Sequence, residues 1–107
     1  MDHCLIVESR DPAEHVDVER MAELARGLSL RGCKTALLFI DNGVFAVREG
    51  VAPWLQRLSG DGVALAADRL SLAQRGIDET AMTAGVDATE PEFVVDWLEA
   101  GASVIWN

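Results

Sequence analysis

Carboxylates and an arginine follow two of the most apolar stretches of the chain. Asp41, Asn42 and Gly43 come directly after residues 35–40, and Asp68 and Arg69 come directly after residues 63–67. Two carboxylates beside an arginine could carry out general acid/base chemistry or hold a ligand. Residues 41–43 also suit a plain turn, which we favour as their main role because Asp, Asn and Gly are typical turn residues.

Other polar residues stand near the same positions of the predicted fold. Arg69 and Arg75 flank a short segment after the second acidic position. Each is an ordinary solvated charge in most proteins, but together they could hold an anion or an acidic segment of a partner. Polar residues also end the first and last apolar runs: Glu8, Ser9, Arg10 and Asn107.

The two cysteines precede apolar runs instead of following them. Cys4 and Cys33 stand at the amino ends of the first and second runs, so we expect them at the opposite edge of a sheet from Asp41 and Asp68. Cys33 also follows the predicted end of a helix, whose negative dipole end disfavours a thiolate. We expect free, structural thiols, and we keep either one as a candidate for a catalytic or sulfur-carrying residue.

Known cofactor motifs are missing from the sequence. No GxGxxG or Walker-type glycine loop follows an apolar run, which argues against a nucleotide site. His3 and His15 are far apart, and no cluster of Cys and His has the spacing of zinc ligands. We therefore predict no cofactor and no metal.

The apolar runs have the length and composition of buried β-strands. The second run, residues 35–40, does not alternate apolar with polar residues, which is typical of a central strand covered on both faces. We predict further strands over residues 4–7, 63–67 and 102–106, with a minimal one near Val86.

Helical patterns alternate with these strands. The spacing predicts a helix from Asp17 to a stop at Gly32, with one buried stripe, and a last helix that begins near Pro91 and ends at Gly101. The predicted stripe residues are Val18, Met21, Ala22, Leu24, Ala25 and Leu28 in the first helix and Phe93, Val94, Trp97 and Leu98 in the last. Shorter helical pieces are expected over residues 44–50, over 53–58, and over 72–75 behind a Ser71 cap. The alternation indicates an α/β fold, a parallel sheet with helices on both faces.

Composition limits the classes of function. The chain has 107 residues, enough for one domain over 1–107, and a net charge of −9 that disfavours binding to nucleic acid or to an anionic membrane. The amino-terminal stretch does not have the pattern of a signal peptide, so we expect a cytoplasmic protein. Trp54, Trp97 and Trp106 are expected to anchor the core or a subunit interface.

The ordered set of motifs resembles the DsrE/DsrF/DsrH-like family of small sulfur-relay proteins, which includes the TusB, TusC and TusD subunits. The similarity covers nearly the whole chain and rests on these segments: Gly32-Cys33-Lys34-Thr35 before the second strand, Asp41-Asn42-Gly43-Val44 after it, Ser71-Leu72, Arg75-Gly76-Ile77, and Gly101-Ala102-Ser103-Val104-Ile105. The resemblance implies a three-layer, flavodoxin-like fold with about five parallel strands, assembly into trimers or hexamers, and a role in moving persulfide sulfur between proteins.

The chain departs from the family at one position. Active members carry sulfur on a cysteine just past the third strand, a few residues before the Arg-Gly turn. Residues 66–72 contain no cysteine, and Asp68 stands near the expected place. A carboxylate cannot form a persulfide, so the pattern is closer to DsrF or TusC, the partner-type subunits that lack the carrier cysteine.

Three hypotheses follow. The leading one is a non-catalytic DsrE/DsrF-like subunit that assembles with itself or with a DsrE-like paralogue and forms a docking surface for a sulfur-carrier protein. The second is a sulfurtransferase that uses Cys33 or Cys4. The third is a small-ligand binding module at a subunit interface, with Asp41, Asn42 and Asp68 among its contacts together with Arg69.

Overall fold

The sheet has five parallel strands in the order β4-β3-β2-β1-β5. A computed structural model describes residues 2–107. The strands are β1 (His3–Glu8), β2 (Lys34–Phe39), β3 (Ala64–Asp68), β4 (Val86–Thr89) and β5 (Ser103–Trp106). The predicted α/β class, with a parallel sheet and helices on both faces, is confirmed, and the minimal strand at Val86 is confirmed as β4.

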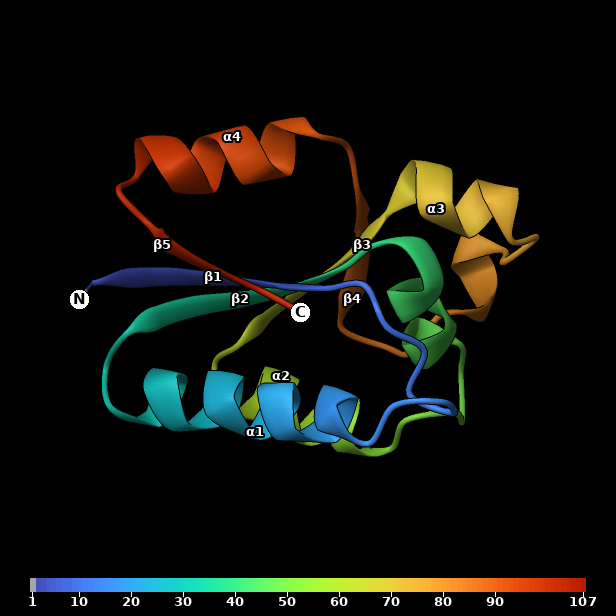
Figure 1. Ribbon diagram of the computed structural model, residues 1–107, viewed down its shortest axis with the longest axis horizontal. Coiled ribbons are helices and arrows are strands. Elements are labelled where there is room, and N and C mark those ends of the chain that lie inside the picture. Colours follow the sequence, from blue (N-terminus) through green and yellow to red (C-terminus); the bar gives the residue numbers. More distant parts are fainter. Residues whose placement is uncertain (1) are drawn as a thin grey trace.

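The helices lie in two places relative to the sheet. Helices α1 (Asp17–Leu30) and α2 (Trp54–Gly60) cover one face, and α4 (Glu92–Glu99) covers the other, which gives three layers (Figure 1). The chain steps in one direction from β1 to β4 and then crosses back to β5, so right-handed crossovers put α4 on the face opposite α1 and α2. The short elements η1 (Asp41–Val47), α3 (Arg69–Gln74) and η2 (Glu79–Ala81) gather at the carboxyl ends of the strands (Figure 1).

Both faces of the central strands are buried, which explains why their sequences do not alternate. Ile6 and Phe39 pack toward α1 and α2, whereas Leu5 and Leu38 pack in the cluster that α4 covers. The core is smaller on the α4 side of the sheet, where neither α4 nor β5 contains a fully buried residue.

Two expected stripe residues and one expected anchor are exposed. Leu24 of α1 and Leu98 of α4 were predicted to be buried, but their exposed fractions are 41% and 52%. The side chains of α1 that are buried, Val18, Ala22 and Ala25, cover a narrower arc than the sequence pattern suggested. Trp54 and Trp97 pack against the two core clusters. Trp106 on the edge strand β5 is 66% exposed, so it is not a core anchor.

The helices lie where the sequence pattern predicted them, but the bounds of three short ones differ. The piece expected over residues 44–50 ends at Val47, and the piece expected over 53–58 extends to Gly60. The helix expected at residue 44 begins at Asp41, because the turn residues form the first part of η1. Helix α3 begins at Arg69 and is capped by Asp68, not by Ser71, because β3 continues to Asp68 and leaves that carboxylate at the N-cap position.

Candidate functional site

A chain of hydrogen bonds joins the carboxyl ends of β2 and β3. The hydroxyl of Ser71 donates to Oδ2 of Asp68 at 2.6 Å and accepts the backbone N–H of Asp41 at 3.0 Å. Oδ2 of Asp68 also accepts the backbone N–H of Ser71 at 3.0 Å, which is its capping bond. Ser71 is buried, and no histidine or lysine takes part in this chain of bonds. The arrangement therefore ties the loop after β2 to the start of α3.

Arg75 joins the same end of the sheet. Its Nε donates to Oδ1 of Asn42 at 3.0 Å, and its Nη1 donates to the carbonyl of Ser71 at 3.3 Å. Asp41 has a φ of 49°, in the left-handed region that Asp tolerates better than most residues. The structure thus brings together Asp41, Asn42, Asp68 and Arg75, four of the residues that the sequence singled out.

Gly43 lies against the end of β1. A Cβ built on Gly43 would stand 2.2 Å from the carbonyl oxygen of Glu8. That same oxygen accepts the N–H of Ile40 at 3.0 Å, so the backbones of β1, β2 and η1 meet here without room for a side chain. The position of Gly43 is explained by this close approach.

A buried carboxylate lies beneath these loops. The side chain of Glu8 is fully buried, and its two oxygens accept from Nδ2 of Asn107 at 2.9 and 3.1 Å. The backbone N–H of Arg10 donates to Glu8 Oε2 at 3.0 Å. The sequence placed Glu8 and Asn107 at this edge but gave no signal of their pairing, since they are 99 residues apart.

Arg69 lies apart from this group. Its guanidinium pairs with Glu79 at 2.8 Å and with Glu90 at 2.6 Å, toward the edge strand β4. The hydrogen bonds that the guanidinium donates to the Glu79 carboxylate, and then to that of Glu90, raise the pKa of Arg69 above its ordinary value. Its charge is therefore occupied by carboxylates of the chain.

Both cysteines lie at the other end of the sheet. Cys4 is the second residue of β1 and Cys33 immediately precedes β2; both are free thiols, with exposed fractions of 0% and 8%. Burial, and to a lesser degree the neighbouring Cys33, raises the pKa of the Cys4 thiol. Neither sulfur is exposed beside Asp41 or Asp68.

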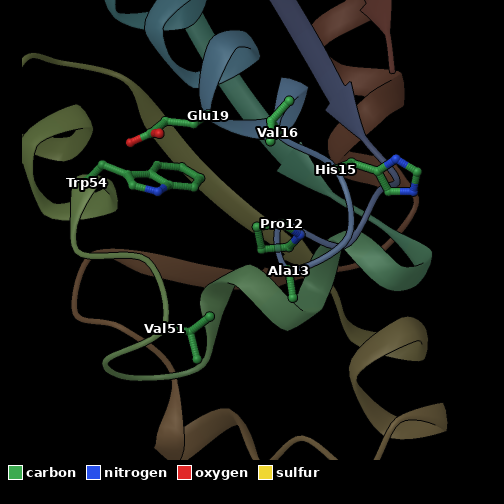
Figure 2. A pocket seen from close by; sticks show the side chains of 7 residues that line it. All are labelled: Pro12, Ala13, His15, Val16, Glu19, Val51 and Trp54. Atoms are coloured by element: carbon green, nitrogen blue, oxygen red, sulfur yellow. The ribbon is translucent and has the colours of Figure 1, made fainter.

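Two cavities open close to the carboxyl ends of the strands. One, of about 450 Å³, is lined by Phe45, Arg48, Glu49, Arg75, Gly76, Ile77, Asp78 and Ala81. The other, of about 310 Å³, lies between the segment before α1 and the start of α2. Figure 2 shows the Trp54 indole and the Glu19 carboxylate on one side of this second cavity and the His15 ring turned away from that indole.

The described part of the chain offers no metal centre and no membrane span. Within residues 2–107, no three His, Cys, Asp or Glu side chains are grouped so that they could hold a metal ion. No helix in the same range is long and apolar enough to cross a bilayer.

Comparisons with known proteins give a match in structure only. The ychN protein of E. coli superposes with a TM-score of 0.87 over 100% of both chains at 20% identity. MTH1491 of Methanobacterium thermoautotrophicum, described as a protein of unknown function, gives 0.80 at 19% identity over 99% of this chain and 98% of its own. BT1422 of Bacteroides thetaiotaomicron, described as a conserved protein of unknown function, gives 0.78 at 16% identity, with coverages of 99% and 95%.

The chain therefore shares the three-layer α/β, flavodoxin-like fold of these structures. No protein-family model matches the chain, and no curated protein matches its sequence significantly. At these identities the structural likenesses show the fold alone, so the activity has to be argued from the site.

Proposed function

We propose that this chain is a non-catalytic DsrE/DsrF-like subunit of a sulfur-relay system, which forms a docking surface for a persulfide carrier. The observation that carries the proposal is the absence of a thiol where the sequence resemblance expects one. Asp68 stands near that place, and its carboxylate already accepts hydrogen bonds from Ser71. Among residues 2–107 both cysteines are buried at the amino end of the sheet.

The surface proposed for docking is the carboxyl edge of the sheet. It presents Asp41 and Asn42, which are exposed, and the half-buried side chains of Asp68 and Arg75. Gly43 allows the loop after β2 to lie against the end of β1. Arg69 lies at the β4 side of this edge, where its guanidinium is already paired with Glu79 and Glu90. A fixed polar edge of this kind suits recognition of a partner's surface, since its side chains need little ordering on binding.

The test is a sulfur-loading experiment. The protein is incubated with a small-molecule persulfide donor, trapped with an alkylating reagent and weighed by mass spectrometry, alongside Cys4→Ser and Cys33→Ser variants. We expect no stoichiometric sulfur on the native chain. Stoichiometric loading that one of the two variants abolishes would overturn the proposal and establish the alternative, a sulfurtransferase that uses Cys33 or Cys4.

We also propose that the chain assembles with itself or with a DsrE-like paralogue. Apolar side chains on α4 and β5 are exposed together: Val95, Leu98, Val104 and Trp106. Strand β5 pairs with β1 on one side only and forms an edge of the sheet. Exposed apolar residues beside a free strand edge are typical of subunit interfaces.

Sedimentation tests the assembly. If the chain pairs with itself, Leu98→Gln and Trp106→Gln should shift it toward monomer, whereas Leu30→Gln, an equally exposed apolar position at the end of α1, should not. A native chain that stays monomeric at micromolar concentration would contradict self-assembly and leave only the paralogue as partner. In that case a mixture with a cysteine-bearing paralogue must sediment as a complex, or the assembly proposal fails.

A further inference from the structure

Two arginines line the larger cavity at the carboxyl end of the sheet. Arg48 follows η1 and Arg75 follows α3, and both side chains border the same space of about 450 Å³. Its walls include Phe45 and Ile77, which are half-buried apolar residues. The lining therefore combines two arginines and apolar surface with two carboxylates, Glu49 and Asp78.

Neutral groups hold the inner part of each guanidinium. Nε of Arg48 donates to the carbonyl of Phe45 at 3.0 Å, and its guanidinium lies 4.9 Å from the centre of the Phe45 ring. Arg75 donates through Nε to Asn42 and through Nη1 to the carbonyl of Ser71. Within residues 2–107, both Nη groups of Arg48 and the Nη2 of Arg75 make no hydrogen bond to another residue.

Ion pairs divide the eight arginines of this acidic chain into two groups, and within residues 2–107 Arg20, Arg31 and Arg57 form none. Arg10, Arg26 and Arg69 each form an ion pair with an acidic side chain. Arg48 and Arg75 form no ion pair with any carboxylate of the described range. Two guanidinium groups that form no ion pair within residues 2–107 thus border one cavity of a chain with 18 acidic residues and nine basic ones.

Two carboxylates, those of Glu49 and Asp78, also line this cavity. Asp78 accepts the N–H and the hydroxyl of Thr80, which lowers its pKa and fixes it as a local cap. Glu49 makes no side-chain hydrogen bond to another residue of the described range. Its negative charge opposes an anion in the cavity, so removing that charge should tighten anion binding.

We infer that this cavity binds an oxyanion carried on a small apolar group, with Arg48 and Arg75 contacting the anion and Phe45 and Ile77 contacting the apolar part. Guanidinium groups bind carboxylates, sulfates and phosphates through paired, charge-assisted hydrogen bonds. Apolar walls with a few convergent polar groups are typical of small-molecule sites. The inference depends neither on sulfur transfer nor on assembly.

Titration of the native chain with benzoate and phenyl phosphate, followed by calorimetry and by NMR of the arginine Nε–H groups, tests the site. Sulfate and inorganic phosphate form a second arm that asks whether the anion alone suffices. Neutral benzamide, which has the same ring as benzoate, is the control ligand. We expect benzoate or phenyl phosphate to bind and to shift the Arg48 and Arg75 signals, with benzamide at least about tenfold weaker.

Variants that change charge by the same amount sharpen the test. Arg48→Gln should weaken binding by about tenfold or more, Arg57→Gln on α2 should leave it unchanged, and Glu49→Gln should tighten it. Arg75→Gln is informative only if its melting temperature stays near that of the parent, because Arg75 also holds Asn42. Equal weakening by Arg48→Gln and Arg57→Gln, or benzamide binding as well as benzoate, would overturn the inference.

Discussion

Replacing Gly43 by alanine tests how tightly the candidate site is built onto the sheet. The new Cβ would stand 2.2 Å from the carbonyl oxygen of Glu8, whereas real Cβ contacts are at least 3.0 Å, so one of the two must move by about 0.8 Å. Neither can move freely. Glu8 O accepts the N–H of Ile40, and the Gly43 N–H donates to the Ile40 carbonyl at 2.8 Å.

The expected cost follows from this overlap. Forcing one methyl group into a packed region usually costs about 1–3 kcal/mol. Because the clashing atom is backbone at the end of a central strand, we expect Gly43→Ala to cost about 3 kcal/mol, the upper end of that range. For a domain of this size such a loss lowers the melting temperature by roughly 12 °C or more.

Gly27 provides the matched control. It lies inside α1, and a Cβ there would meet nothing within 4 Å, so Gly27→Ala should stabilise the chain by about 0.5–1 kcal/mol. Thermal and urea unfolding followed by circular dichroism measure both variants, and amide NMR shifts at Glu8 and Ile40 locate the disturbance in Gly43→Ala. A Gly43→Ala protein as stable as the parent would refute the close packing of η1 on β1.

Three further changes probe the surroundings of the site. Asn107→Ala removes the side-chain donor of the buried Glu8 carboxylate and should lower the free energy of unfolding by about 1.5–3 kcal/mol; an unchanged urea midpoint would exclude this role. Ser71→Ala breaks the link from Asp68 to the loop after β2 and should cost about 1–2 kcal/mol, measured in the same titration, and no loss would mean that the link is not stabilising. Because the pKa of the Cys4 thiol is raised in the folded chain, this thiol ionises in the unfolded chain first as the pH passes 9.0. The free energy of unfolding should therefore fall more steeply above this pH in the native chain than in Cys4→Ala, and identical pH profiles of the two proteins would contradict the raised pKa of Cys4.

The architecture could be predicted because a strand that is buried on both faces of the sheet has a continuous run of apolar residues in its sequence. The strands β2 and β3 are continuous apolar runs, and Gly32 and Gly101 lie just past the ends of α1 and α4 with positive φ. The rule that carboxyl ends of parallel strands share an edge then placed Asp41 near Asp68.

Other features depend on distances that the sequence does not contain. Asp68 and Ser71 are both good N-cap residues, and which of them caps α3 is decided by the exact end of β3. The pairing of Arg69 with Glu79 and Glu90 depends on how η2 and β4 return beside α3. Leu98 satisfies the helical period, but α4 covers the sheet with too few neighbours to bury it.

The hydrogen bonds at the carboxyl edge of the sheet support the proposed docking role. Asp68 stands near the place where the family resemblance expects a carrier cysteine. Its carboxylate accepts hydrogen bonds from Ser71, and the Ser71 hydroxyl in turn accepts the N–H of Asp41 in the loop after β2. A sulfur carrier needs a thiol that can reach a partner, whereas these bonds keep the loop in one position. That fixed position aligns Asn42 with Arg75 at the border of the larger cavity. A change that disorders the loop should therefore weaken anion binding even when both arginines are intact. Ser71→Ala, compared with the parent in the benzoate titration, tests this because it alters the position of the loop without changing any charge. An unchanged affinity for benzoate would mean that Arg75 needs no support from β3.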